Sequence, residues 1–442
     1  MVPDEGQCAS GYGNRLLQDA GAAVRVAPHP ETHPALRWAQ CGAMALTGEP
    51  GEAPQVCPVP LAAYADGILE ALRALQPAAE FGDLRGAQLL SERAALARLR
   101  RGGVVAAGGS CRLLRAGDGW LALNLARPSD WELLPAWLEA PHVQGWDEVA
   151  SRLGHCDAQV ALERGRLLGL ALAPLAGGAA PCWCRGLERR PSSAARSAPL
   201  VVDLSALWAG PLCTHLLQRM GARVIKVESL RRPDAMREAG NGLFDLLNAG
   251  KESVALDLAS ESGRALLRAL LRRADIVVEA ARPRALRQLG IIAEEYLAAN
   301  PSLTWVSISG YGRSEPGASW VAFGDDGAVA GGLSGVLQAA CGRVLFCADA
   351  IADPLTGMHA ALAAWTTFSG GRGGLLSLAL CEVVAHCIAC AALDGPEAPR
   401  AQTAAWTQRL RGVEVCPPCA RPVGARARPL GTDTHAVLAT LS

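Results

Sequence analysis

The chain has 442 residues, a formal net charge of zero and a hydrophobic content of 50%. This length can bury more than one core, and the balanced charge gives no electrostatic reason to bind nucleic acid or an acidic membrane surface. Its apolar stretches fall short of the roughly 20 residues that a spanning helix needs, and the N-terminus has no basic segment before an apolar run. We therefore expect a cytoplasmic enzyme that acts on small molecules.

Cysteine usage points to a reducing compartment. The 15 cysteines are an odd number and show no disulfide-like spacing, which favours free thiols. Two close pairs, Cys182 with Cys184 and Cys416 with Cys419, have no histidine or cysteine partners at zinc-finger spacing. We interpret them as loop cysteines and predict no metal site.

The N-terminal part of the chain contains an internal repeat. Leu16–Ala22 and Leu216–Ala222 both start with Leu-Leu-Gln and end with Gly-Ala, and an alternating strand pattern follows each of them, Ala23–Val26 and Val224–Val227. Chance is the alternative interpretation, because glycine commonly ends helices. A later correspondence of helix-like segments, Leu61–Leu75 with Leu355–Phe368, favours a true repeat. We predict that residues 1–80 are a degenerate partial copy of a later domain.

Residues 85–178 show a different pattern. Two strand-like runs, Ser110–Arg115 and Trp120–Leu125, flank the turn Asp118-Gly119, and this is a strong hairpin signal. Pro128–Asp130 then begins a helix that continues through Trp137. We predict a small α+β domain here, followed by a linker over residues 179–198.

Residues 199–395 alternate strands with helices. The expected strands are Val201–Leu204, Val224–Val227, Val254–Leu258, Ile276–Glu279 and Thr304–Ser309. Such alternation predicts an α/β fold with a doubly wound, mostly parallel, Rossmann-like sheet. The turn after the first strand is not Gly-x-Gly-x-x-Gly, which argues against a nicotinamide-dependent oxidoreductase. Residues 396–442 are expected to form a tail that returns to this large domain.

Asp353 is the candidate catalytic residue. The local sequence predicts a helix N-cap, with Pro354 at the first helical position and the amides of Thr356 and Gly357 directed toward the carboxylate. The same amides could hold the oxyanion that forms when a thioester carbonyl is attacked. Taken alone, a structural cap is the commoner interpretation.

The order of these motifs resembles family III CoA-transferases, the CaiB/BaiF family that includes formyl-CoA transferase and carnitine CoA-transferase. Ala352–Met358 matches the family pattern Gly-Asp-x-x-x-Gly-Met, with Ala352 departing from its first glycine. The resemblance implies that Asp353 attacks an acyl-CoA and carries CoA as an aspartyl thioester until a carboxylic acid acceptor takes it. It also implies that Gly310 lies near the reacting centre, that no cofactor is bound permanently, and that the chain forms a homodimer.

Further positions match the family segments that lie near the CoA nucleotide, and these are Asn248, Gly250, Lys251, Leu256 and Arg282. Lys251 would either meet a phosphate or be a solvated turn residue. Ala280 and Gln288 depart from the family pattern, which leaves the CoA affinity open.

Two more comparisons limit the chemistry. In the first copy, Ala63 occupies the position of the nucleophile, so we expect one functional site per chain. Asp325 and Asp326 lie where the racemase branch of the family has a catalytic histidine, which argues against racemisation.

The glycine-rich residues 369–374 lack a P-loop ending and predict a helix-to-strand turn.

Three functions remain open at this point. The first is an acyl-CoA:carboxylic acid CoA-transferase. The second is an acyl-CoA isomerase or intramolecular CoA transfer on the same fold, which needs no acceptor acid. The third is a non-catalytic homologue that binds CoA thioesters.

Overall fold

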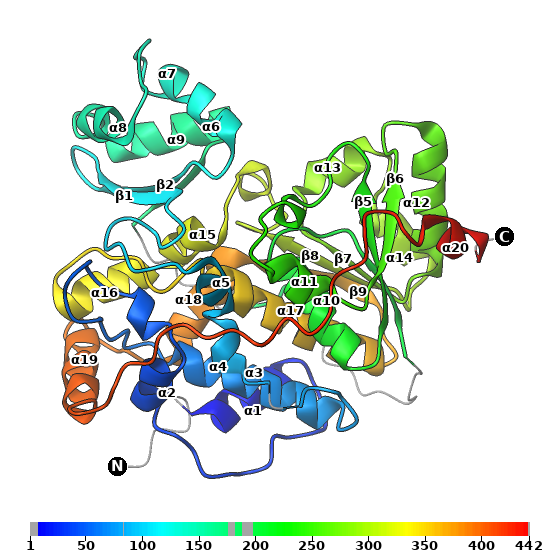
Figure 1. The fold of residues 1–442 in the computed structure, drawn as a ribbon, viewed down its shortest axis with the longest axis horizontal. Helices are drawn as coiled ribbons and strands as arrows, with labels where there is room; N and C mark the ends of the chain where they lie inside the picture. Colours follow the sequence, from blue (N-terminus) through cyan, green and yellow to red (C-terminus); the bar gives the residue numbers. More distant parts are fainter. Residues whose placement is uncertain (1–7, 83, 176–181, 188–197, 441–442) are drawn as a thin grey trace.

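The computed structural model describes residues 8–82, 84–175, 182–187 and 198–440. Figure 1 shows a large sheet with its helices on one side of the molecule, a group of N-terminal helices packed beside it, and a small lobe above them. Most of the predicted linker, residues 179–198, lies outside the described residues. The candidate site lies between these parts.

The large sheet has six parallel strands in the order β6-β5-β4-β7-β8-β9. The strands are β4 (Leu200–Asp203), β5 (Arg223–Ser229), β6 (Glu252–Leu256), β7 (Ile276–Glu279), β8 (Thr304–Ser309) and β9 (Gly374–Ala379). The prediction of a mostly parallel α/β sheet is confirmed. The chain leaves β4 toward one edge and later returns to the other side of β4 at β7, so the strand order reverses between these two strands.

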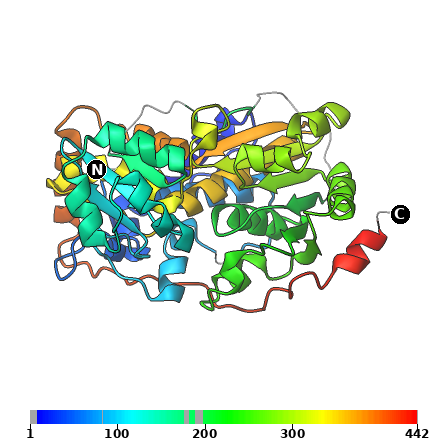
Figure 2. The same ribbon diagram turned by 90° about the horizontal axis from the view of Figure 1, so that it is seen from above.

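Helices cover both faces of this sheet (Figure 2). Successive strand residues point to opposite faces, so Val201 enters the core formed with α10 and α17, whereas Val202 enters the core formed with α12. This double burial explains why the strands read as nearly continuous apolar runs. The helices of this unit are α10 (Ala209–Arg219), α11 (Leu243–Asn248), α12 (Glu261–Arg273), α13 (Pro283–Gln288), α14 (Ala293–Ala299), α15 (Gly324–Ala330), α16 (Leu333–Cys341), α17 (Ala352–Ser369) and α18 (Leu380–Cys390). The short 3-10 helices are Ala235–Arg237 and Gly317–Ser319.

The N-terminal helices pack against the same core as α17. They are α1 (Ala9–Asp19), α2 (Pro34–Gln40), α3 (Leu61–Leu75), α4 (Gly86–Leu89) and α5 (Glu92–Ala97), with a 3-10 helix at Met44–Leu46. The predicted strand Ala23–Val26 is wrong. No described strand pairs with this segment, and the Val26 amide donates instead to Oδ1 of Asn14 at 2.8 Å.

The two halves of the sequence repeat share one packing device. Helix α1 packs closely on α3, as α10 packs on α17. At Gly357, an added Cβ would lie 2.5 Å from the carbonyl oxygen of Ala209, and at Gly67 it would overlap the carbonyl oxygen of Ala9. Ala9 and Ala209 are 200 residues apart, the same offset as the Leu-Leu-Gln motifs at Leu16 and Leu216, and in both helix pairs a glycine lets the two backbones meet closely.

The small lobe is an antiparallel three-stranded sheet covered by short helices. Its strands are β1 (Cys111–Arg115), β2 (Trp120–Asn124) and β3 (Ala171–Pro174), in that order. The β1–β2 hairpin around Asp118-Gly119 is confirmed, whereas the helix expected from Pro128 through Trp137 is divided into two. The helices are α6 (Pro128–Glu132), α7 (Leu134–Trp137), α8 (Trp146–Leu153) and α9 (Ala158–Leu168).

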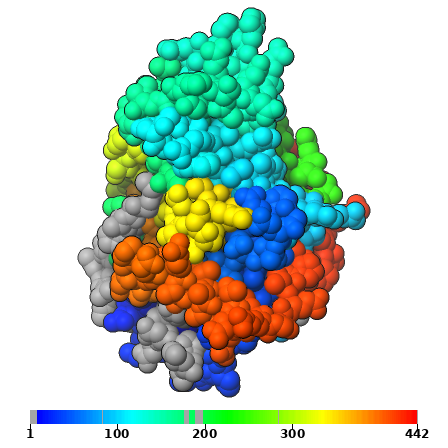
Figure 3. Space-filling view, turned by 90° about the vertical axis from the view of Figure 1, so that its left-hand side faces the viewer, coloured from blue at the N-terminus to red at the C-terminus, as the bar shows by residue number. Residues whose placement is uncertain are grey.

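The C-terminal segment crosses the molecule as a strap. After α19 (Ala398–Arg409), which lies on the face shown in Figure 3, the chain runs without regular structure to α20 (Thr434–Ala439; Figure 1). Helix α20 packs on β6. Arg421 pairs with Glu92, and the Asp433 carboxylate accepts from the Ser253 amide at 2.8 Å. Among the described residues, no helix combines the length and hydropathy needed to cross a bilayer.

Candidate active site

A cavity of about 250 Å³ opens at the carboxyl ends of β4, β7 and β8. Ligand sites of open α/β sheets form where the strand order reverses, and this cavity lies at that point, between β4 and β7. Its walls are mostly apolar, with Asp353, Arg127 and Arg282 as the ionisable side chains. The other lining residues are Ala206, Leu207, Trp208, Ala209, Ala280, Ala281, Ile308, Ser309, Gly310, Gly317, Ala318, Trp320, Val321, Ala322, Phe323 and Leu380.

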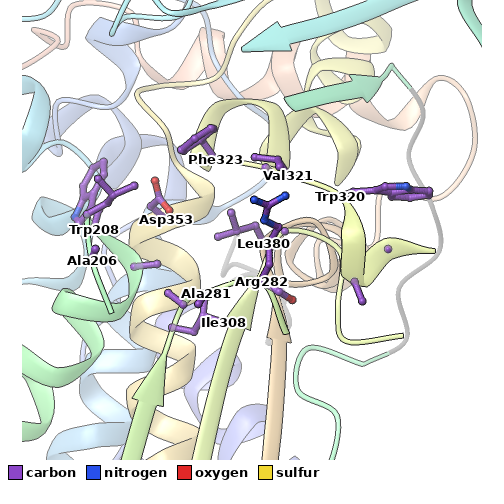
Figure 4. Close-up of a pocket in the computed structure, with 18 of the residues that line it drawn as sticks. Ala206, Trp208, Ala281, Arg282, Ile308, Trp320, Val321, Phe323, Asp353 and Leu380 are labelled. Carbon is purple, nitrogen blue, oxygen red and sulfur yellow. The ribbon is translucent and has the colours of Figure 1, made fainter. Parts of the chain in front are cut away.

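Asp353 reaches this cavity from the first turn of α17 and is partly exposed to it (Figure 4). In the view of Figure 4, Trp208 and Phe323 lie around the carboxylate, and Arg282 and Leu380 lie farther along the cavity. Gly324 allows the close approach of α15, because an added Cβ there would lie 2.5 Å from Oδ2 of Asp353. A carboxylate is therefore held at the wall of an apolar cavity.

The predicted N-cap at Asp353 is wrong. Helix α17 begins at Ala352, its N-cap is Ile351, and Pro354 takes the third helical position, where its missing N–H costs no intrahelical hydrogen bond. The Asp353 amide donates to the carbonyl oxygen of Ala350 at 2.9 Å, so the preceding turn starts the helix early. The carboxylate is thereby free of a capping role.

Acidic groups surround Asp353. Burial raises the pKa of Asp353 to about 7; Arg93 lowers this pKa, while Asp325, Asp326 and Asp349 raise it. Burial also raises the pKa of Asp325 to about 6 and that of Asp326 to about 7. A pKa near 7 makes both the protonated and the ionised form of Asp353 accessible near neutral pH.

The other residues predicted near the reacting centre are divided between the cavity and the core. Gly310 lines the cavity, and an added Cβ there would lie 2.5 Å from that of Ala322. Thr356 and Gly357 do not line it, because Thr356 is fully buried and Gly357 faces the backbone of α10. Within the described residues, the Thr356 hydroxyl has no hydrogen-bond partner. The structure brings Asp353 and Gly310 together, but not Thr356 and Gly357.

The segment predicted near the CoA nucleotide lies in the protein interior. The Lys251 ammonium is buried and contacts Asp203 Oδ2 at 3.1 Å, Thr214 Oγ1 at 2.7 Å and Asn248 Oδ1 at 2.9 Å. Of the two interpretations left open for Lys251, a solvated turn residue is wrong, because its ammonium is buried and compensates the buried Asp203 carboxylate. Its placement also gives no support to a phosphate contact, since it lines no described cavity.

The other matched residues of that motif also have structural roles. Asn248 also donates to the carbonyl oxygen of Phe244 at 3.0 Å, and Leu256 belongs to the core on the α12 face of the sheet. Gly250 has φ of 86°, a left-handed conformation that favours glycine. These residues therefore stabilise the turn that leads into β6 and the strand itself.

Arg282 lies at the cavity, as the motif predicted for a ligand contact. It follows β7 and lines both the cavity of Asp353 and an adjoining depression of about 1010 Å³ below the small lobe. Arg127 and Trp320 line both spaces as well, and Arg284 lines the depression. Within the described part of the chain, no hydrogen bond or ion pair engages the Arg282 guanidinium, and burial together with nearby arginines lowers its pKa. The unpaired Arg282 guanidinium suits an anionic ligand, whereas Arg127 is already paired with Asp130.

Sequence reasoning missed several wall residues. Trp208 and Phe323 belong to loops that follow or precede predicted elements, and the rule that ligands bind at the carboxyl ends of parallel strands points to Trp208 but not to Phe323. Arg127 comes from the small lobe, and no local pattern indicated that this lobe reaches the cavity.

The described residues contain one group with metal-ligand chemistry, made of His29, Glu31 and Glu70. Glu31 already pairs with Arg37 at 3.1 Å, and none of the three residues lines the cavity. The close pairs Cys182 with Cys184 and Cys416 with Cys419 form no disulfide.

Comparison with known proteins gives a family. Residues 199–416 match the model of CoA-transferase family III. The succinyl-CoA–D-citramalate CoA-transferase of Chloroflexus aurantiacus is 32% identical over 195 residues, which is 42% of this chain and 48% of that protein. The acetyl-CoA:oxalate CoA-transferase of Acetobacter aceti is 35% identical over 146 residues, which is 32% of this chain and 37% of that protein.

A third relative is the formyl-CoA:oxalate CoA-transferase of Escherichia coli, which is 32% identical over 166 residues, 36% of this chain and 40% of that protein. The chain thus spans less than half the length of these curated relatives. Among solved structures, Rv3272 of Mycobacterium tuberculosis matches with 26% identity and a TM-score of 0.40, covering 45% of this chain and 57% of that one. A CaiB/BaiF family protein of Brucella suis matches with 25% identity and a TM-score of 0.37, covering 52% and 58%.

Proposed function

Residues 199–416 belong to CoA-transferase family III, and from this premise we propose that the chain transfers CoA from an acyl-CoA to a carboxylic acid through Asp353. The observation that carries the proposal is the position of the Asp353 carboxylate, in an apolar cavity at the point where the strand order reverses. Acyl-CoA and carboxylate substrates agree with the activities named for the relatives.

The first half of the reaction breaks the donor thioester. An oxygen of the Asp353 carboxylate attacks the thioester carbonyl carbon, and the CoA thiolate leaves, which gives a mixed anhydride. The thiolate then attacks the Asp353 carbonyl carbon of this anhydride, which releases the donor acid as a carboxylate and leaves CoA on Asp353 as a thioester.

The second half reverses these steps with the acceptor. The acceptor carboxylate attacks the aspartyl thioester and expels the CoA thiolate, and the thiolate then attacks the acceptor carbonyl carbon. The acceptor acyl-CoA leaves, and the Asp353 carboxylate is restored. The reaction needs no redox group and no net proton.

The cavity walls suit this chemistry. Mixed anhydrides and thioesters hydrolyse if water reaches them, and the apolar walls formed by Trp208, Phe323 and Leu380 limit its access. Gly310 lets the wall after β8 pack against Ala322, because an added Cβ would lie 2.5 Å from that of Ala322. Desolvation also makes the ionised Asp353 carboxylate more nucleophilic.

Arg282 is proposed to hold the anionic part of CoA. Its guanidinium lies between the small cavity and the larger depression, so a CoA whose thioester reaches Asp353 can place its phosphates near Arg282, Arg127 and Arg284. A substrate in this orientation would pass beneath the small lobe.

Trapping of the intermediate tests the function. The protein is incubated with a panel of short and branched acyl-CoA thioesters and quenched with hydroxylamine or borohydride, and the peptide that contains Asp353 is analysed by mass spectrometry. We expect modification of Asp353 in the native chain and in Glu279→Gln, and none in Asp353→Asn. Glu279 is the matched control, a buried carboxyl that does not line the cavity and whose pKa burial also raises to about 7.

The three functions give different outcomes. Labelling of Asp353 together with an acyl-CoA product that appears only when an acceptor acid is added supports the transferase. A rearranged acyl-CoA without any acceptor favours the isomerase, and thioester binding without labelling favours a non-catalytic protein.

A further inference from the structure

The turn before α17 holds two alanines in a conformation that alanine disfavours. Ala348 has φ of 56° and Ala350 has φ of 40°, both in the left-handed region. A side chain with a Cβ adopts this region only where the surrounding contacts fix it. The residue between them, Asp349, has a fully buried side chain.

Three contacts fix this turn. The Ala348 amide donates to Oγ1 of Thr47 at 3.0 Å, and the Ala350 amide donates to Oδ1 of Asp325 at 2.9 Å. Arg93 donates from Nε to Oδ2 of Asp349 at 2.9 Å and from Nη2 to Oδ1 at 2.5 Å, a two-point contact that fixes direction as well as distance. Thr47 and Arg93 both lie outside the segment that matches the family model.

Arg93 also touches a wall of the cavity. Its guanidinium carbon lies 5.5 Å from the ring centroid of Trp208, which lines the cavity after β4. One side chain from α5 therefore joins the β4–α10 turn to the turn before α17.

We propose that Arg93 is a positioning residue for Asp353: it holds Asp349, fixes the turn 348–350, and so directs the Asp353 carboxylate into the cavity. The turn transmits this constraint, because the carbonyl oxygen of Ala350 accepts from the Asp353 amide at 2.9 Å. The inference rests on the proposed role of Asp353 as the nucleophile. It gives the N-terminal part of the chain a function in the site.

The charges around Asp353 give Arg93 a measurable signature. Arg93 favours the ionised carboxylate, and Asp325, Asp326 and Asp349 disfavour it, so removal of the guanidinium raises the pKa of Asp353. Loss of an ion pair elsewhere in the chain has no such effect.

The test compares Arg93→Met, Arg93→Lys and Arg421→Met in the full chain. Arg421 is the matched control, since it pairs with Glu92, the neighbour of Arg93; the side-chain exposures are 18% and 2%, against 25% and 0% for Arg93 with Asp349. One readout is the pH dependence of carbodiimide modification of Asp353 in the resting protein, followed by peptide mapping. The other is the rate of aspartyl-thioester formation, with kcat and KM separated.

We expect Arg93→Met to lower the rate of thioester formation at least tenfold with little change in KM, and to move the Asp353 modification profile to higher pH. Arg93→Lys should restore part of the rate and move the modification profile part of the way back. Arg421→Met should match the native chain in rate and in modification profile. Equal effects of Arg93→Met and Arg421→Met would overturn the proposal. If Arg93→Met fails to fold, the double variant Arg93→Met with Asp349→Asn removes the uncompensated buried carboxylate. We expect this double variant to fold but not to recover the native rate of thioester formation.

A native chain that forms no aspartyl thioester would contradict the proposed function alone. The carbodiimide profile would still decide on Arg93, because it needs no turnover. An unshifted profile in both Arg93 variants would then reject the positioning role.

Discussion

Substitution of Lys251 by methionine separates a structural role from a ligand role. Its ammonium and the Asp203 carboxylate are 1% and 0% exposed, and the two groups lie 3.1 Å apart. The pKa of Asp203 is lowered to about 2, since Lys251, Lys226 and the hydroxyls of Ser205 and Thr214 together outweigh the effect of burial. Without Lys251, a buried carboxylate loses its nearest cation.

Removing one member of a buried ion pair lowers the free energy of unfolding by about 3–5 kcal/mol. A typical free energy of unfolding is about 5–15 kcal/mol, so this loss is a large part of it. We expect Lys251→Met to lose about that amount in urea unfolding, and Lys251→Met with Asp203→Asn to recover much of it, because the double variant buries no uncompensated charge. The exposed pair of Arg223 with Glu252 supplies the control, and Arg223→Met should cost about 1 kcal/mol or less.

The same variants are assayed for KM toward acyl-CoA. A structural Lys251 leaves KM unchanged in the folded fraction. This reasoning would be refuted if Lys251→Met lowered the unfolding free energy by less than about 1 kcal/mol and also raised KM. That result would favour a contact between Lys251 and CoA.

Four further predictions concern the cavity and the helix packing. Aspartyl-thioester formation should rise with pH through about 7 and then level off, because Asp353 must be ionised to attack; a rate that is flat from pH 5 to 9 would contradict its pKa, which burial raises to about 7. A raised carboxyl pKa means that the folded state holds the proton more tightly, so the stability contributed by Asp353 falls as pH rises from about 4 to 7, and Asp353→Asn should flatten this part of the stability profile. Gly67→Ala and Gly357→Ala should each cost about 1–3 kcal/mol of unfolding free energy, since the new Cβ meets a helix carbonyl, whereas Gly335→Ala, in open space on α16, should cost nothing. Arg282→Ala should raise KM for acyl-CoA about 10–100-fold, the loss of a charge-assisted contact, while Arg264→Ala on α12 should leave KM unchanged.

Five of the six strands of the large sheet were predictable because most of their residues are apolar and buried; β9 was expected only as the strand that follows the turn at residues 369–374. The strand order was not predictable, since parallel pairing depends on contacts between distant segments. Asp353 was found through its motif, but the start of its helix was misplaced because the turn 348–350 is fixed by Thr47 and Arg93, which are far away in the sequence.

The errors at other positions have the same cause. A lysine in a turn motif suggests exposure, and only the fold places Lys251 beside Asp203, 48 residues earlier. The strand expected at Ala23–Val26 had the correct alternation, but it had no neighbour with which to pair. The homodimer, the domain boundaries and the one-site-per-chain expectation stay predictions.

The burial of α17 determines which parts of the molecule can move to admit a substrate. From Pro354 to Phe368 the helix is buried on every side, so its amides should open only with the whole core and should exchange with deuterium most slowly. The small lobe has a core of its own and contributes Arg127 to the rim of the cavity. The strands of the lobe pack on α15, so we expect its outer helices α6–α9 to exchange faster than α17 and to be slowed by added acyl-CoA.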